Sequence, residues 1–114
     1  MRSLLTFLLL SLFVLMRLEA QGIEFMEGDW KAALAEAKKE KKLIFVDAYA
    51  SWCGPCKRMA QTVFTRKEAG AFFNEKFINF KIDMEKGEGP AFGDKYPVRA
   101  YPTLMFIDYN GELV

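Results

Sequence analysis

The chain has 114 residues, which is enough for one domain and too few for two ordinary ones. Hydrophobic residues make up 52% of it, and this composition excludes an intrinsically disordered chain. The 16 basic and 15 acidic residues nearly balance and histidine is absent, which argues against nucleic-acid binding and excludes histidine-dependent nucleophiles and histidine-ligated metal sites.

The first 20 residues have the pattern of a secretory signal peptide. One basic side chain, Arg2, precedes an apolar run from Leu4 to Leu15, and the small residue Ala20 ends the segment. This apolar run is shorter than the roughly 20 residues that a membrane span needs. We therefore expect export with cleavage after Ala20. An uncleaved N-terminal anchor and a buried helix of the domain are the alternatives. The protein is therefore expected to be periplasmic or secreted, with residues 21–114 forming one domain.

The first part of this domain is predicted to contain a strand, a helix and a strand. A short strand is expected over Ile23 to Met26, and Asp29 is suited to cap the helix that follows. Helical spacing then gives one apolar stripe, made of Trp30, Ala33, Leu34 and Ala37. The continuous apolar run Leu43–Val46 is typical of a strand covered on both faces, at the centre of a parallel sheet.

The next segment is predicted to contain two helices. The first runs from Gly54 to about Thr65 and places Cys56 on a core-facing stripe that also contains Met59, Ala60 and Val63. Cys53 lies ahead of this stripe at the helix tip, where its side chain is expected to face solvent. Thr65 and Glu68 fit a capping box for the second helix, whose inward residues are expected to be Ala69, Phe72 and Phe73.

The remaining residues predict two strands around a short helix. The strands are expected over residues 77–82 and 103–108, and the helix over 91–96. Residues 108–111, Asp-Tyr-Asn-Gly, have the composition of a hairpin turn. The order of elements predicts an α/β domain with a central mixed sheet flanked by helices. A strand normally runs about five residues beyond its turn, so we expect the domain to be C-terminally incomplete after Val114; the alternative is a short natural edge strand.

The two cysteines, Cys53 and Cys56, are separated by Gly54 and Pro55. A structural disulfide between residues this close would enclose almost no loop and would add little stability. Zinc needs four protein ligands, or three and a water molecule, and two thiols without histidine supply only half of that. A redox-active pair is therefore favoured by elimination. The predicted position at a helix N-terminus agrees with this, because it stabilises the thiolate that disulfide exchange requires. Gly54 permits a tight turn into the helix, and Pro55 suits the first helical turn.

Two segments carry a resemblance to a known family. They are VDAYASWCGPCK (Val46–Lys57) and YPVRAYPTL (Tyr96–Leu104). Through them, the chain from about Ile23 to Val114 resembles the thioredoxin superfamily. Its long lead helix and the lysine-rich approach to the Leu43 strand are similar to the periplasmic domain of DsbD-type disulfide reductases. The resemblance implies a thioredoxin-like fold, truncated before the last strand and helix of the family.

The resemblance also implies roles for individual residues. Asp47 matches a buried acid that helps to move the Cys56 proton, and burial would raise its pKa; the alternative is an aspartate that only bonds a neighbouring N–H. Pro102 matches a cis-proline beside the disulfide. The residues expected to border the substrate are Trp52, Gly54, Pro55, Tyr101, Pro102 and Thr103. The family often has a lysine near the buried acid, and counting along the next strand places Asn79 there, with Lys81 two residues away.

The function implied by the resemblance is that of a thiol–disulfide oxidoreductase. Reduction of protein disulfides is the expected direction, because Gly-Pro between the cysteines resembles the reducing members. Disulfide-containing proteins would be its substrates, and a membrane electron donor its partner. Its own Cys53–Cys56 disulfide would be the redox group, with no metal, no other cofactor and no nucleic acid. Two alternatives remain open: a disulfide oxidase or isomerase, because Tyr101 before Pro102 resembles isomerases, and a thioredoxin-fold binding module without catalysis.

Overall fold

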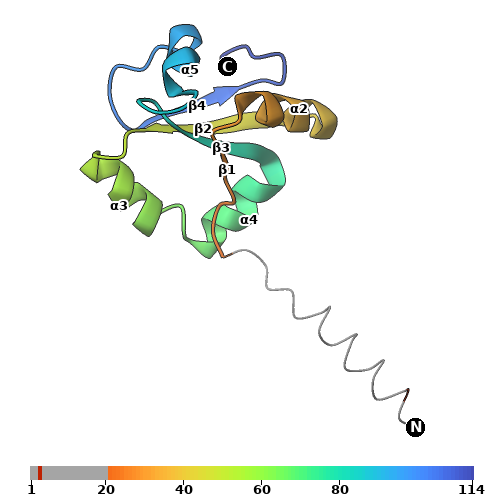
Figure 1. The fold of residues 1–114 in the computed structure, drawn as a ribbon. Helices are drawn as coiled ribbons and strands as arrows, with labels where there is room; N and C mark the ends of the chain where they lie inside the picture. Colours follow the sequence, from red (N-terminus) through yellow and green to blue (C-terminus); the bar gives the residue numbers. More distant parts are fainter. Residues whose placement is uncertain (1–2, 4–20) are drawn as a thin grey trace.

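The computed structural model describes Ser3 and residues 21–114, and the predicted signal segment lies outside this range. The helices and strands follow in this order (Figure 1): β1 (Met26–Glu27), α2 (Trp30–Glu40), β2 (Leu43–Tyr49), α3 (Gly54–Thr62), α4 (Lys67–Lys76), β3 (Phe77–Asp83), α5 (Gly89–Lys95) and β4 (Thr103–Ile107). None of the described helices combines the length and the apolar character that crossing a membrane requires.

The strands form one mixed sheet in the order β1-β3-β2-β4. β2 pairs in parallel with β3 and antiparallel with β4, and β1 is parallel to β3. Figure 1 shows α2 and α5 on one face of the sheet and α3 and α4 on the other. The predicted α/β class, with both kinds of pairing in one sheet flanked by helices, is therefore confirmed.

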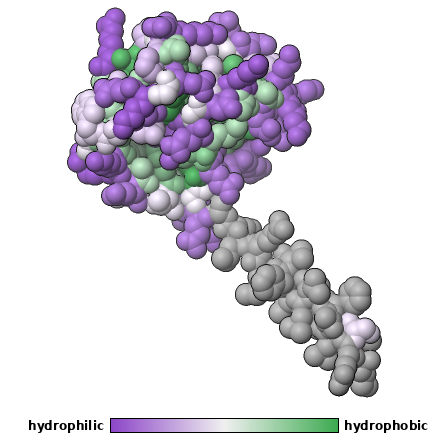
Figure 2. All heavy atoms as spheres, viewed as in Figure 1, coloured by the Kyte–Doolittle hydropathy of each residue, from purple (hydrophilic) through white to green (hydrophobic). Residues whose placement is uncertain are grey.

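The core lies on both faces of β2. Burial is uninterrupted from Ile44 to Ala48, as the apolar run predicted. The largest fully buried side chains are Phe80, Ile44, Ile82, Ile107 and Val46. On one face Trp30 meets three aromatic rings at centroid distances of 5.1 to 5.7 Å, namely Phe80, Phe92 and Tyr96. Figure 2 shows hydrophilic side chains over most of the viewed face, with apolar surface between them.

The first strand is shorter than predicted, because β1 contains only Met26 and Glu27. Ile23 donates its N–H to the Phe64 carbonyl at 2.8 Å. Glu24 donates its N–H to the Asn74 side chain at 2.9 Å. The backbone before β1 is thus bonded to α4 and to the loop that precedes it, instead of to a neighbouring strand.

Helix α2 has a cap at each end. Asp29 Oδ1 accepts a hydrogen bond from the Ala32 N–H at 3.0 Å, which confirms the predicted N-cap. Lys41 ends the helix with a φ of +55°, and its N–H donates to the Ala37 carbonyl. The fully buried members of the predicted stripe are Ala33 and Ala37, so the helix turns the expected side toward the core.

Replacing Asp29 with alanine is expected to lower the free energy of unfolding by about 1 kcal/mol, because the Ala32 N–H loses its partner. Urea unfolding at neutral pH measures the difference. Asp29→Ser is the matched control, since a serine hydroxyl can accept the same hydrogen bond and should restore most of the loss. An equal loss in both variants would show that the cap does not stabilise this helix.

Two expectations about α4 are wrong. Thr65 does not cap it, because the Thr65 hydroxyl donates to the Gln61 carbonyl at 2.7 Å and so bonds back to the preceding helix. Arg66 holds the cap position and makes no side-chain hydrogen bond there. Phe72 is 53% exposed instead of facing inward, with its ring against the edges of Phe73 and Phe77.

The predicted stripe of α3 is also only partly buried. The helix ends at Thr62, and among the stripe residues Cys56 is buried, Met59 is half-buried, and Ala60 and Val63 are exposed. Ala60 lines a cleft of about 520 Å³ together with residues of β2, β3 and the segment before β1. At Ala60, α3 therefore borders open space instead of packing on the sheet.

The turn after β4 has the predicted form. Asp108 Oδ1 accepts a hydrogen bond from the Asn110 N–H at 2.8 Å. Gly111 has a φ of +85°, a conformation that favours glycine. A bridge between Ile107 and Leu113 begins the returning antiparallel pair, so the hairpin turn is confirmed.

Candidate active site

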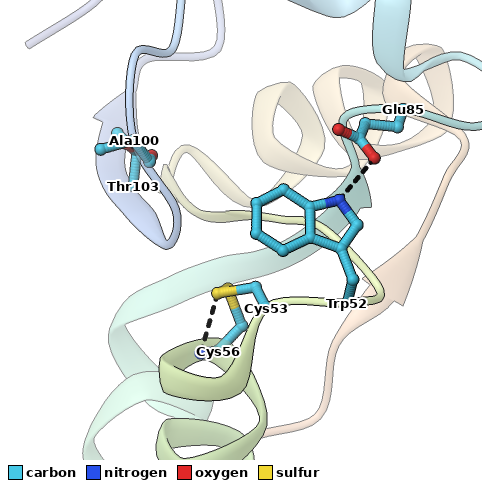
Figure 3. Close-up of a disulfide and its surroundings, with 6 residues drawn as sticks. All are labelled: Trp52, Cys53, Cys56, Glu85, Ala100 and Thr103. Carbon is cyan, nitrogen blue, oxygen red and sulfur yellow. Dashed lines mark hydrogen bonds between the residues drawn. A yellow bond between two sulfur atoms is a disulfide. The ribbon is translucent and has the colours of Figure 1, made fainter.

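A disulfide joins Cys53 and Cys56 at the start of α3 (Figure 3). Their Cα atoms are 5.3 Å apart. Cys53 is the N-cap residue, and its Sγ accepts a hydrogen bond from the Cys56 N–H at 3.2 Å. Pro55 lies in the first turn, as predicted, where a missing N–H costs no helical hydrogen bond. The sulfur atoms therefore lie at the positive end of the helix dipole.

Both cysteines are enclosed. Cys53 is 2% exposed and Cys56 is 6% exposed, so the expectation that Cys53 faces solvent is wrong. Ala50 forms a small cluster with the two cysteines, and two tyrosines pack against it: Tyr49, which precedes Ala50 in the chain, and Tyr101, from the loop before β4. The small exposed part of the disulfide therefore lies beside aromatic side chains.

Trp52 forms an exposed wall next to the disulfide (Figure 3). Its side chain is 66% exposed, yet the indole N–H donates to Glu85 Oε1 at 2.7 Å. Its ring also meets the Tyr101 ring in an edge-to-face arrangement, with the centroids 5.8 Å apart. Glu85 lies in the loop after β3 and carries no motif of its own, so its role was not predicted from the sequence.

The loop before β4 borders the same site. The peptide bond between Tyr101 and Pro102 is cis. The Thr103 hydroxyl donates to the Ala100 carbonyl at 2.6 Å and so bridges the two ends of this turn (Figure 3). The structure thus brings Tyr101 into contact with the cysteine cluster, in a loop whose ends are tied by Thr103.

Asp47 lies in β2 and is 5% exposed. Burial raises the pKa of its carboxyl to about 6, although the nearby Lys81 ammonium acts in the opposite direction. Its Oδ1 is buried and receives no hydrogen bond from the described residues, so a neighbouring N–H does not satisfy this atom. Asp47 and Cys56 both line one cleft of about 240 Å³.

Lys81 lies beside Asp47, so the prediction that Asn79 takes this position is wrong. The two residues are partners in the parallel β2–β3 register. Asn79 instead pairs with Phe45 and donates its side-chain amide to the Phe73 carbonyl at 3.1 Å. The register depends on where the two strands begin to pair, so counting within one strand could not supply it.

A cation site is not evident in the part of the chain that the structure describes. Within Ser3 and residues 21–114, no three cysteine, aspartate or glutamate side chains converge as metal ligands would. The chemistry that this arrangement can perform is that of the sulfur pair, since a dithiol and a disulfide differ by two electrons and two protons.

Comparison with known proteins gives the family. A family model described as Thioredoxin-like matches residues 25–108, more than half of the chain and including both cysteines and the loop before β4. The chain belongs to the thioredoxin-like family. This agrees with the order of strands and helices and with the position of the disulfide at the start of α3.

Relatives of this thioredoxin-like chain include proteins of similar length and much longer ones. A thioredoxin of Echinococcus granulosus is 40% identical over 80% of this chain and 77% of its own length. Thioredoxin-1 of Drosophila melanogaster is 40% identical over 65% of this chain. The chain spans 64% of the length of that fly protein and 20% of a rice protein disulfide isomerase-like relative, which is 34% identical.

Solved structures agree with this assignment. The solution structure of a candidate disulphide isomerase from Bacteroides thetaiotaomicron has a TM-score of 0.72 and 49% identity. The match covers 85% of this thioredoxin-like chain and 80% of that one. A DsbH oxidoreductase has a TM-score of 0.71 over 83% of this chain and 72% of its own; at 22% identity it supports the fold alone.

Proposed function

We propose that the chain is a thiol–disulfide oxidoreductase that reduces the disulfides of proteins outside the cytoplasm. The main support is the Cys53–Cys56 disulfide at the tip of α3, with the buried carboxyl of Asp47 lining the same cleft as Cys56. Export is supported by the signal-peptide pattern of residues 1–20. The pair itself carries the electrons, so the reaction needs no metal or further cofactor.

The reaction begins with the reduced pair. The Cys53 thiolate attacks one sulfur of a substrate disulfide, which breaks the substrate S–S bond, forms a mixed disulfide and releases one substrate thiolate that takes up a proton. Cys56 then loses its proton and attacks the Cys53 sulfur. This step closes the Cys53–Cys56 disulfide and releases the second substrate thiol. The substrate gains two electrons and two protons, and the pair loses them.

Asp47 is the group we assign to the Cys56 proton. With a pKa of about 6, its carboxyl is mostly ionised at pH 7 and can accept a proton, yet it is a stronger base than an exposed aspartate. The cleft that Asp47 shares with Cys56 leaves space through which the proton can pass. Asp47 would return the proton to solvent before the next turnover.

Each turnover leaves the pair oxidised, so a donor must return two electrons to it. We assign this role to a membrane protein with its own dithiol, because an exported reductase lies outside the reducing cytoplasm. The resemblance to the DsbD-type periplasmic domain favours such a donor. Disulfide-containing proteins that reach the edge between Trp52 and Tyr101 are the proposed substrates.

The reduction potential of the Cys53–Cys56 pair tests the direction of electron flow. We expect a value near that of thioredoxin, about −270 mV, measured by equilibrating the full chain with glutathione or dithiothreitol buffers. A potential close to about −120 mV would mean that the protein donates disulfides, which overturns the reductase assignment.

A second candidate function is disulfide isomerisation. It is favoured by Tyr101 before Pro102 and by the 49% identity to the Bacteroides structure, which is described as a candidate disulphide isomerase. A potential near about −180 mV, together with the rearrangement of scrambled disulfides, would favour the isomerase instead.

A further inference from the structure

Three charged side chains stand in one row across the sheet. Glu27 of β1 is the register partner of Lys81 in β3, and Lys81 is the register partner of Asp47 in β2. Register partners in parallel strands project from the same face of a sheet. Lys81 and Asp47 line the cleft of about 240 Å³ together with Ala60 of α3. The three charged side chains therefore lie on the face of the sheet that α3 covers. The Lys81 ammonium therefore has one carboxylate on each side, an outer one and a buried one.

The ammonium pairs with the outer carboxylate. Lys81 Nζ lies 3.9 Å from Glu27 Oε2, and among the described residues the other ion pair is Lys42 with Glu40, so Asp47 has none. The Tyr49 hydroxyl donates to Glu27 Oε1 at 3.2 Å and holds the carboxylate in place. Burial and the nearby Glu27 raise the pKa of Tyr49 to about 12, so this hydroxyl keeps its proton.

The preference for the outer partner has a physical reason. The side chains of Lys81 and Glu27 are 37% and 63% exposed, so their ion pair forms at the edge of the water and requires little desolvation. Pairing with Asp47 would draw the ammonium toward a carboxyl that is 5% exposed. Desolvating a charge is unfavourable unless the geometry offsets it, and Glu27 offers Lys81 a partner that requires little desolvation.

We propose that Glu27 is a positioning residue, which holds the Lys81 ammonium at the outer edge of the sheet and so prevents it from neutralising the Asp47 carboxylate. The other charged or titratable groups that share a cleft or a contact with Asp47 are Tyr49 on its own strand, Cys56 and Lys57 on α3, and Glu24 before β1. None of these four is in register with Asp47 or forms an ion pair with Lys81, whereas Lys81 is the register partner of Asp47 and is paired with Glu27.

This arrangement matters for the chemistry, and here the inference rests on the proposed function. A carboxyl without a bonded cation keeps the raised pKa that burial gives it, close to the working pH. If Lys81 paired with Asp47, the attraction would favour the ionised form and lower that pKa. The residue would then be a weaker base toward the Cys56 thiol.

The test is a titration of the Asp47 carboxyl by carbon-13 NMR in the oxidised full chain, where neither cysteine titrates. In Glu27→Gln, the Asp47 midpoint is expected to fall by about 0.5 to 1 pH unit, a three- to tenfold change in its ionisation constant. Glu24→Gln is the matched control, because it removes an exposed carboxylate that lines the larger cleft of about 520 Å³ beside Asp47 and Lys81 but lies outside the row. It should leave the midpoint unchanged.

A double-variant cycle separates positioning from simple loss of a negative charge. In a Lys81→Gln background, Glu27→Gln should no longer shift the Asp47 midpoint, because the cation that it holds is gone. The proposal is overturned if Glu27→Gln leaves the midpoint unchanged, or if the shift is as large without Lys81. The titration needs no substrate, so it stands independently of the reductase assignment. A shifted midpoint with an unchanged pH profile of disulfide exchange would count against Asp47 as the base and leave the positioning by Glu27 intact.

Discussion

Cys53→Ser is expected to lower the rate of protein disulfide reduction by at least about 10³-fold, because a hydroxyl cannot replace the attacking thiolate. Cys56→Ser should behave differently, since Cys53 can still attack but nothing then resolves the mixed disulfide. We therefore expect Cys56→Ser to accumulate a covalent adduct with a disulfide-bonded substrate. The rate is measured with a protein disulfide and excess reductant, and the adduct by non-reducing electrophoresis and mass spectrometry.

The two variants control for each other, because each replaces one buried thiol with a hydroxyl. The two positions are three residues apart, at the cap and in the first turn of α3. Equal loss of activity without any adduct in Cys56→Ser would mean that Cys53 is not the attacking sulfur. If Cys53→Ser kept its biological activity, the chain would act as a thioredoxin-fold binding module, and catalysis would not be its function.

Asp47→Asn is expected to stabilise the oxidised protein at pH 8 by about 1 to 3 kcal/mol. The folded carboxyl has a pKa of about 6 against an ordinary value of 3.8, and two pKa units correspond to about 3 kcal/mol. Between these values the folded chain keeps a proton that the unfolded chain has lost. The free energy of unfolding should therefore fall as pH rises from about 4 to about 6 and stay level above that. The buried amide needs hydrogen-bond partners, which reduces the gain.

Denaturant unfolding at a series of pH values from 3 to 8 measures this effect. The gain in Asp47→Asn should shrink as the pH falls and be nearly gone at about pH 3, where the carboxyl is mostly protonated in both states of the wild-type protein. Asp94→Asn, at an exposed position of α5, should show no such pH-dependent gain. A wild-type profile that is flat between pH 4 and pH 6 would contradict the raised pKa. We also expect slower closure of the Cys53–Cys56 disulfide in Asp47→Asn, since the proton acceptor is gone.

Sequence reasoning succeeded where one local pattern decides the structure. The apolar run that begins at Leu43 has the pattern typical of a doubly covered strand, and Asp29 supplied an N-cap at the right spacing. Cys53, Gly54, Pro55 and Cys56 were placed correctly at the start of a helix, because proline and an N-capping sulfur both suit a first turn.

The remainder depends on contacts between distant segments. The pairing of β2 with β3 places Lys81 beside Asp47, and a count within either strand does not reveal this register. Cys53 is covered by Tyr101 from a loop far along the chain, so its burial could not be read from the helix pattern. Thr65 fits the pattern of a capping box, but its hydroxyl donates to the Gln61 carbonyl of the preceding helix instead. Glu85 matters only because folding places it within hydrogen-bond distance of Trp52.

The order of the strands also determines which part of the site opens first. β2 is hydrogen-bonded along both edges, so its amides should exchange with solvent deuterium only when the whole domain unfolds. β1 pairs through two residues and can detach in a local opening at much lower cost. Such an opening would carry Glu27 away from Lys81 while Asp47 and the disulfide stay in place. Fraying of β1 would thus change the pKa of Asp47 without moving the Cys53–Cys56 disulfide.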